Sequence, residues 1–358
     1  MHVRRVAVVG LALAAAALPA CGSVERAALP LERLAAAEPT TTTSTSTTLP
    51  PTTIPPTTVP PPPPAVRNVA PAPRPAVTTA PRARTRSTPT VVAGVPAYVG
   101  FGAWVDVFDW SSSYTAGHPT VGPADVDRMA NLGVQTLYIQ AARADSPDDI
   151  VDPGLLNPMI QRAHARGIRV VVWYLPTLTD VGADLRRLLA ISRLGVEGLS
   201  VDIESREVQD PGERSRRLVD LSNQLRAALP GRTIGAIVFP PTGMEVINPS
   251  YWPGFPWAGI APDYDVWLPM AYWTGRSQDS GWHDGYRYTA DNVQRLRNDL
   301  HNPAAPVHPI GGIADKVTAA EVDGMVRAVA ATGSIGGSLY DYRTSGPDLW
   351  PHLTPLRR

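Results

Sequence analysis

The stretch Glu197-Gly198-Leu199-Ser200-Val201-Asp202-Ile203-Glu204 predicts a short buried β-strand that ends in two acids. Because side chains alternate across a strand, Ser200, Asp202 and Glu204 share one face, and the apolar residues between them share the other. Carboxylates are costly to bury and usually lie where water or a ligand can reach them. We therefore expect Asp202 and Glu204 to lie at the mouth of a functional site.

From about residue 98 onward, short apolar runs alternate with amphipathic helical stretches, which indicates repeated β-α units and a mainly parallel sheet. The expected strands are 99–108, 134–140, 168–175, 198–203, 233–239, 264–272, 307–313 and 335–342. The expected helices are 123–132, 153–166, 180–194, 211–229, 289–300 and 318–332. Pro, Thr or Asp at their starts and Gly after several of their ends are the expected capping residues.

The number of these units favours one closed architecture. Eight strands in about 260 residues match an α/β fold of the (β/α)8 TIM-barrel type. A doubly wound open sheet is the alternative, but no Gly-rich phosphate-binding fingerprint follows the first strand. Residues 240–262, rich in Pro, Gly and aromatic residues, are expected to form a long loop with one short helix.

In such a barrel the functional groups lie at the carboxyl ends of the strands. Acids, amides and aromatic rings occupy those positions, and these are the candidate site residues: Asp106, Asp109, Gln140, Trp173, Tyr174, Asp202, Glu204, Met270, Tyr272, Trp273, Asp315, Tyr340, Asp341 and Tyr342. Rings beside carboxylates suit a sugar, whose CH faces stack while its hydroxyls need polar partners. Four more tryptophans, Trp252, Trp257, Trp267 and Trp282, lie near strands five and six and strengthen that interpretation, although rings also fill cores and hold loops.

The stretch 197–204 resembles the D-G-x-D-x-D-x-E signature on strand four of family 18 glycoside hydrolases, the chitinase-like enzymes. Met270-Ala271-Tyr272 resembles the M-x-Y of that family's strand six, and Gly337-Ser338-Leu339 lies where its Gly-containing strand eight would lie. The resemblance spans about residues 99–342. It implies that Glu204 is the general acid, that Asp202 orients the substrate's 2-acetamido group, and that Tyr272 helps to hold that group.

Two acids on one face of a strand repel each other, so we expect one pKa to rise and keep a proton for donation while Asp202 stays ionised. The chain also departs from the family pattern, because Glu197 and Ser200 replace two of its aspartates and Trp273 follows the strand-six tyrosine. These departures leave open a direct two-acid mechanism in which Asp106 or Asp341 supplies the second carboxylate. We expect Asp106, Gln140, Trp173, Tyr174, Met270, Trp273, Asp341 and Tyr342 to bind substrate.

The N-terminal part predicts export. Arg4 and Arg5 precede an apolar run over 6–18, which fits a signal peptide (1–20) better than a membrane span. Cys21, the only cysteine, follows Leu18-Pro19-Ala20 and resembles a bacterial lipidation site; ordinary cleavage after Ala20 is the alternative. Residues 21–96, rich in Thr and Pro, predict a disordered linker before the barrel domain at 97–358. We expect a monomer, anchored to the outer face of the membrane through lipid on Cys21 or secreted.

Composition excludes several other functions. The chain has 32 basic and 32 acidic residues and no basic stripe in the folded part, so we expect no nucleic-acid partner. Its seven histidines form no H-E-x-x-H motif and no G-x-S-x-G occurs, so we expect no metal, no cofactor and no nucleophile elbow. Three functions stay open: a glycosidase acting on a cell-envelope or environmental polysaccharide, an inactive glycan-binding barrel, and a scaffold that recruits an envelope protein through residues 240–262.

Overall fold

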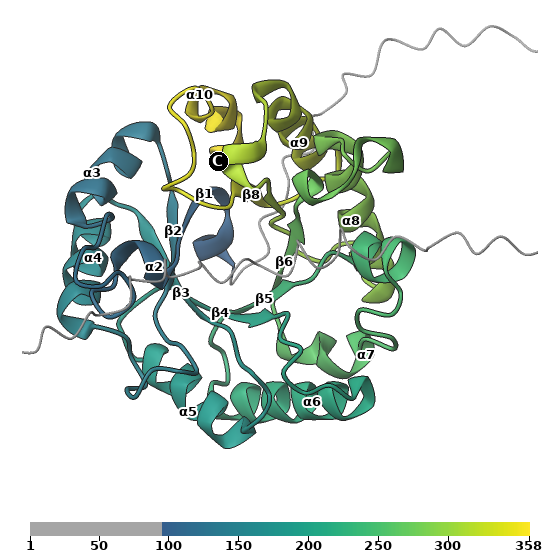
Figure 1. The fold of residues 1–358 in the computed structure, drawn as a ribbon, viewed down its shortest axis with the longest axis horizontal. Helices are drawn as coiled ribbons and strands as arrows, with labels where there is room; N and C mark the ends of the chain where they lie inside the picture. The colour runs from purple at the N-terminus through teal and green to yellow at the C-terminus, as the bar shows by residue number, and fades with distance from the viewer. Residues whose placement is uncertain (1–94) are drawn as a thin grey trace, which may run out of the picture.

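The computed structural model describes residues 95–358, which form a closed barrel of eight parallel strands in sequence order (Figure 1). The strands are β1 (Gly100–Val105), β2 (Thr136–Gln140), β3 (Arg169–Tyr174), β4 (Gly198–Ile203), β5 (Ile234–Val238), β6 (Val266–Ala271), β7 (Ile310–Gly311) and β8 (Gly336–Leu339). Pairing of β8 with β1 closes the ring, with Gly100 opposite Gly336. The (β/α)8 barrel expected from the sequence is thereby confirmed.

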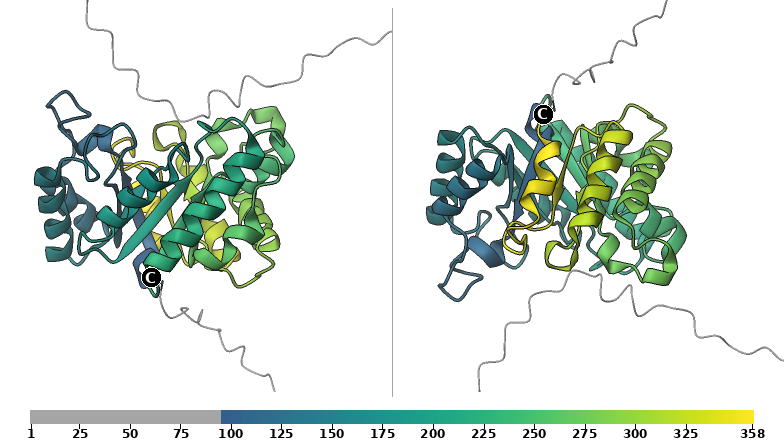
Figure 2. Two further views of the ribbon diagram at one scale, coloured as in Figure 1. Left: turned by 90° about the horizontal axis from the view of Figure 1, so that it is seen from below. Right: turned by 90° about the horizontal axis from the view of Figure 1, so that it is seen from above.

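Helices surround the strands on the outside of the barrel (Figure 2). They are α2 (Val107–Trp110), α3 (Pro123–Leu132), α4 (Pro153–Ala165), α5 (Val181–Ile191), α6 (Pro211–Ala228), α7 (Trp257–Ile260), α8 (Gly285–Asp299), α9 (Ala319–Ala331) and α10 (Trp350–Leu353). Side-chain caps start several of them: Asp180 accepts from the Ala183 amide at 2.9 Å, and Asp210 accepts from the Glu213 amide at 2.7 Å. Such caps satisfy amides that the first helical turn leaves without intrahelical partners.

The strand β4 has the bounds that the sequence predicts. It lies between β3 and β5, with Ser200 opposite Trp173 and Asp202 opposite Ile237. Every residue of β4 is buried, because its outward side chains pack against the helices and its inward side chains fill the barrel. The carboxyl end of β4 therefore places Asp202 and Glu204 at the rim of the barrel.

A tyrosine fills the opposite, amino-terminal end of the barrel. Tyr98 ends a short 3-10 turn (η1, Pro96–Tyr98), is fully buried, and donates a hydrogen bond of 2.6 Å from its hydroxyl to the carbonyl of Leu199. A Cβ at Gly198 or Gly235 would lie within 3 Å of the Tyr98 ring or hydroxyl. Glycine at these two positions of β4 and β5 therefore makes the room that the ring occupies.

All the expected strands except β4 are shorter in the structure, and the first and the seventh show why. The first ends at Val105, because the side chain of Asp106 accepts from the Phe108 amide at 2.8 Å and so starts α2. The seventh keeps only two ladder residues, because Pro309 has no amide hydrogen to pair; Val307 forms an isolated bridge with Trp267.

Residues 240–262 form an irregular connection, as expected, with one turn of π-helix (η2, Gly243–Ile247) and the short helix α7. A 3-10 turn (η3, Ala261–Asp263) then leads towards β6. Val95, which the sequence assigned to the linker, is already buried in the core. The predicted signal peptide, Cys21 and the rest of the predicted linker lie outside the described residues. Within residues 95–358, none of the helices has the length and apolar character needed to span a membrane.

Candidate active site

A cavity of about 720 Å³ opens at the carboxyl ends of the strands, and Asp202 of β4 and Glu204, just beyond its end, both line it. Asp202 and Glu204 are each only 6% exposed. They lie on one face of the strand end, two residues apart, as the alternation of the sequence predicts. Within residues 95–358, no group donates a hydrogen bond to Oδ1 of Asp202, which is buried. A buried carboxylate oxygen without a partner at a cavity wall is suited to accept a hydrogen bond from a ligand.

Burial dominates the electrostatics of this pair. It raises the pKa of Glu204 to about 7. Burial first, and the charge of Glu204 second, raise the pKa of Asp202 well above its usual range. The pair therefore keeps a proton at neutral pH, and the two carboxyls titrate together. This differs from the expectation that Asp202 stays ionised, because the sequence does not reveal how completely β4 and its neighbours exclude water from that side chain.

Aromatic rings form the floor of the cavity. Trp173 of β3 lines it as expected, and Trp104 of β1 lies beside it with ring centroids 6.0 Å apart in an edge-on arrangement. Trp104 also stacks on Tyr138, with centroids 4.3 Å apart and ring planes within 9°. An apolar floor of this kind offers stacking area for the CH face of a sugar.

A directed chain of hydrogen bonds fixes Trp104. The Nε1 group of Trp104 donates to Oγ of Ser338 at 2.8 Å, and that hydroxyl lies 3.0 Å from Nε2 of His308. Nδ1 of His308 lies 2.8 Å from the carbonyl of Tyr98, so we assign the ring proton to Nδ1 and the acceptor role to Nε2. Burial lowers the pKa of His308 to about 4, so the ring is neutral at neutral pH. Each hydrogen bond from Trp104 through Ser338 to His308 therefore keeps the same donor and acceptor.

Two tyrosines and an acid form a side of the cavity. Tyr272 and Tyr340 line it with ring centroids 6.1 Å apart, and Met270 lies beside them. Burial first, then the charges of Glu204, Asp202 and Asp341, raise the pKa of Tyr272, so its hydroxyl stays protonated and can donate. The hydroxyl of Tyr340 donates to Oδ2 of Asp106 at 2.9 Å. Gln140 also lines the cavity, and its Oε1 accepts from the Val107 amide at 3.2 Å.

One trio of acids in the described residues has a spacing that a metal ion could use. One carboxylate oxygen from each of Asp106, Asp109 and Asp341 lies within 4.8 Å of the others. However, Asp109 pairs with Arg343 at 2.6 Å, and Asp341 accepts from the amide and the hydroxyl of Thr344 at 2.9 and 2.8 Å. Because these partners already compensate the carboxylates, we assign no metal to this trio.

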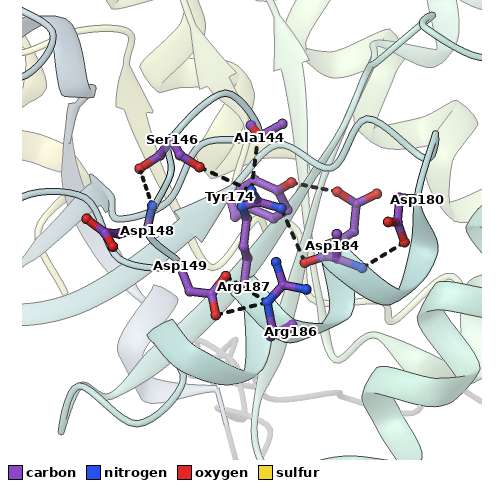
Figure 3. A network of polar contacts seen from close by, with 10 residues as sticks. Ala144, Ser146, Asp148, Asp149, Tyr174, Asp180, Asp184, Arg186 and Arg187 are labelled. Carbon is purple, nitrogen blue, oxygen red and sulfur yellow. Dashed lines mark hydrogen bonds and ion pairs between the residues drawn. The ribbon is translucent and has the colours of Figure 1, made fainter.

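A buried polar network holds two loops that form part of the cavity wall (Figure 3). Arg187 of α5 donates from Nη2 to the carbonyls of Ala144 and Ser146 at 3.1 and 3.2 Å, in the loop after β2. Asp184 accepts from the Tyr174 hydroxyl at 2.6 Å and from the Leu178 amide at 2.9 Å, in the loop after β3. Ala144 and Thr177, which lie in these loops, line the cavity.

Some candidate residues lie elsewhere. Tyr174 points out of the barrel to Asp184 (Figure 3). Trp273 is fully buried against β7, where a Cβ on Gly311 would lie 2.7 Å from its ring. Tyr342 contacts Asp125 and packs against Trp350 at 5.6 Å. The tryptophans near strands five and six, Trp252, Trp257, Trp267 and Trp282, pack in the core or against it and do not line the cavity.

Other cavity residues were not among the candidates that we expected to bind substrate. They include Trp104, Phe108, Arg143, Ser205, Arg206, Glu207, Lys316, Tyr340 and Thr344. Strand alternation could have identified Trp104, which precedes Asp106 by two residues, whereas Tyr340 was already among the candidate residues at the strand ends. The charged side chains lie on loops, whose conformation leaves no periodic signal in the sequence.

No protein-family model and no curated protein matches this chain. Solved structures do share its fold. The spore cortex-lytic enzyme SleL of Bacillus cereus superposes with a TM-score of 0.53 and 11% identity, over 73% of this chain and 74% of that one. A family 18 chitinase from Cycas revoluta in complex with allosamidin gives 0.53 and 12% identity, over 72% and 98%. A class V chitinase from Nicotiana tobaccum gives 0.52 and 9% identity, over 72% and 98%. The barrel is therefore similar to that of the family 18 chitinases.

Proposed function

We propose that this protein is a glycoside hydrolase that cleaves O-glycosidic bonds of a cell-envelope or environmental polysaccharide, with Glu204 as the general acid. The observation that carries the proposal is the buried pair Asp202 and Glu204 at the end of β4, which keeps a proton and lines a cavity with an aromatic floor. Chitinases and a cortex-lytic enzyme among the proteins of similar fold support it.

Glu204 has the property that protonation of a leaving group requires. A carboxyl that is still protonated near neutral pH can transfer its proton to the glycosidic oxygen as the bond to that oxygen breaks. Its position at the cavity wall gives it access to a substrate, while its 6% exposure limits competition from bulk water. The aromatic pair Trp104 and Trp173 would stack against the sugar.

Asp202 and Tyr272 would act on the sugar that carries the new reducing end. The unpartnered Oδ1 of Asp202 can accept from the N–H of a 2-acetamido group, and the protonated hydroxyl of Tyr272 can donate to the acetamido oxygen. The acetamido oxygen would then attack the anomeric carbon while Glu204 protonates the departing oxygen. We favour this route over a nucleophilic Asp106 or Asp341, because hydrogen bonds from Tyr340 and Thr344 already occupy those carboxylates.

One observation keeps a second function in view, a glycan-binding barrel without catalysis. Ser200 lies below Asp202 in place of an acid, and its side chain is fully buried. Asp202 therefore lacks a carboxyl neighbour on that side with which to exchange a proton. In either function we propose export, with lipid on Cys21 or cleavage after Ala20, action as a monomer on a glycan, and no nucleic-acid partner.

Hydrolysis of a panel of glycans tests the proposal. The purified protein is incubated with chitin oligosaccharides, with peptidoglycan and with a β-glucan that lacks acetamido groups, and new reducing ends are measured. We expect cleavage of an acetamido-bearing polymer only. Retention of glycan without any cleavage would instead favour the binding barrel, and cleavage of the β-glucan alone would exclude the acetamido route.

A further inference from the structure

The carbonyl of Glu204 has an unusual partner. The ladder between β4 and β5 ends with Ile203 opposite Val238, so the main chain of Glu204 lies just beyond the sheet. The hydroxyl of Tyr251 donates to this carbonyl at 2.9 Å. Tyr251 belongs to the irregular connection 240–262 and is 1% exposed. A residue 47 positions along the chain therefore holds the main chain of the proposed acid.

The ring of Tyr251 is itself rigidly placed. It stacks on Phe239, the residue after β5, with ring centroids 3.9 Å apart and planes within 14°. The guanidinium of Arg206, which lines the cavity, lies 5.1 Å from the centroid of the same ring. Stacked aromatic pairs of this kind restrict the ring to a narrow range of positions.

The connection that carries Tyr251 is anchored to α6. Arg214, only 2% exposed, donates from Nη2 to the carbonyl of Tyr251 at 3.1 Å and lies 4.1 Å from the ring centroid of Trp252. Nε1 of Trp252 donates to Oγ of Ser215 at 2.9 Å. These contacts with α6 hold the backbone at Tyr251 and the side chain of Trp252, independently of the bond from the Tyr251 hydroxyl.

We propose that Tyr251 is a positioning residue for the general acid: its hydroxyl fixes the main chain of Glu204 beyond the end of β4, and thereby the direction of the carboxyl. This inference rests on the proposed function of Glu204. Catalytic groups need placement to within about 0.5 Å, and a shift of about 1 Å can cost about 100-fold in rate. The sheet cannot supply that constraint at Glu204, because β5 offers no ladder partner there.

Tyr251→Phe tests the inference, because it removes the hydroxyl and keeps the stacked ring. We expect kcat to fall about tenfold while KM changes less than about twofold, since the substrate contacts are retained. Tyr264→Phe is the matched control. It removes another buried tyrosine hydroxyl, one that lies 3.0 Å from Oγ of Ser222, and should leave kcat unchanged. Wild-type turnover by Tyr251→Phe, or an equal loss in both variants, would overturn the inference.

A titration that needs no turnover separates this inference from the proposed function. The side-chain carboxyl of Glu204 is followed by carbon-13 NMR in the purified protein, with Glu204→Gln to assign its signal. A carboxyl released by Tyr251→Phe gains water, so its titration midpoint should fall by about half a pH unit or more. Tyr264→Phe should leave the midpoint in place. An unchanged midpoint in Tyr251→Phe contradicts the inference even if the wild type cleaves no glycan.

Discussion

The hydroxyl of Tyr340 donates a hydrogen bond of 2.9 Å to Oδ2 of Asp106, and this bond joins the ends of β8 and β1 at the closure of the barrel. Both residues line the cavity. Asp106 also accepts from the Phe108 amide at 2.8 Å, so its carboxylate is held from two directions. These two hydrogen bonds hold the carboxylate of Asp106, which the sequence alone presents as a candidate catalytic acid.

Removing that hydroxyl should loosen Asp106. We expect Tyr340→Phe to lower the free energy of unfolding by about 1 kcal/mol, because the partly buried carboxylate of Asp106 loses one donor while the ring stays in place. If Asp106 orients a sugar, kcat/KM should fall about fivefold, mainly through KM. Urea denaturation and steady-state kinetics measure the two effects; no change in either would show that the bond is dispensable.

The pH dependence of hydrolysis should reveal the shared proton. Because burial raises the pKa values of Glu204 and Asp202, kcat/KM should fall only as the pH rises through neutrality, well above the range of an ordinary glutamate. In Asp202→Asn the repulsion between the carboxyls disappears, so the alkaline limb should move to lower pH. Rate profiles of both proteins between pH 4 and pH 9 check this. An alkaline limb that stays fixed would argue against coupling of the two acids.

The same pair should lower stability at high pH. The pKa of Glu204 is about 7 in the folded protein, above its unfolded value, so its protonated form favours folding and stability is lost as the pH rises through about 7. Glu204→Gln removes this loss, and we expect it to be more stable than wild type by about 1 to 3 kcal/mol at pH 8. The advantage should vanish towards pH 4. Thermal melts of the two proteins across this range measure the difference.

Arg187 and its neighbour Arg186 offer a matched test of the network in Figure 3. Arg187→Met leaves two loop carbonyls without their donor, and we expect a loss of about 2 kcal/mol in stability and a lower kcat/KM as the cavity wall loosens. Arg186→Met breaks only an exposed ion pair with Asp149 and should cost less than about 1 kcal/mol. Equal losses in the two variants would refute a special role for the buried arginine.

The barrel could be predicted from the sequence because its units repeat. Apolar runs, capping residues and glycine stops locate β4 and α3 with the bounds that the structure has, and the end of β4 carries both acids. The strand ends were less predictable. Asp106 caps a helix and so ends β1, and Pro309 interrupts β7; both effects depend on local hydrogen bonds that the apolar pattern does not contain.

The candidate site was predictable only where strand geometry determines it. Trp173, Asp202, Glu204, Met270 and Asp341 line the cavity. Tyr174, Trp273 and Tyr342 point elsewhere, because adjacent residues at a strand end face opposite sides and the sequence does not say where each strand stops. Tyr251 and Arg206 lie on loops, whose conformation the sequence pattern does not reveal. Their contacts near Glu204 could therefore be found only from the structure.

Turnover by Glu204→Gln tests the proposed function most directly. Glutamine has nearly the same shape but cannot donate the proton that the leaving oxygen needs, so kcat on the polysaccharide that the wild type cleaves should fall at least about 100-fold. Binding of the same glycan and the folded state, followed by thermal melting, should be retained. Hydrolysis by Glu204→Gln within about twofold of the wild-type rate would contradict the assignment of Glu204 as the general acid.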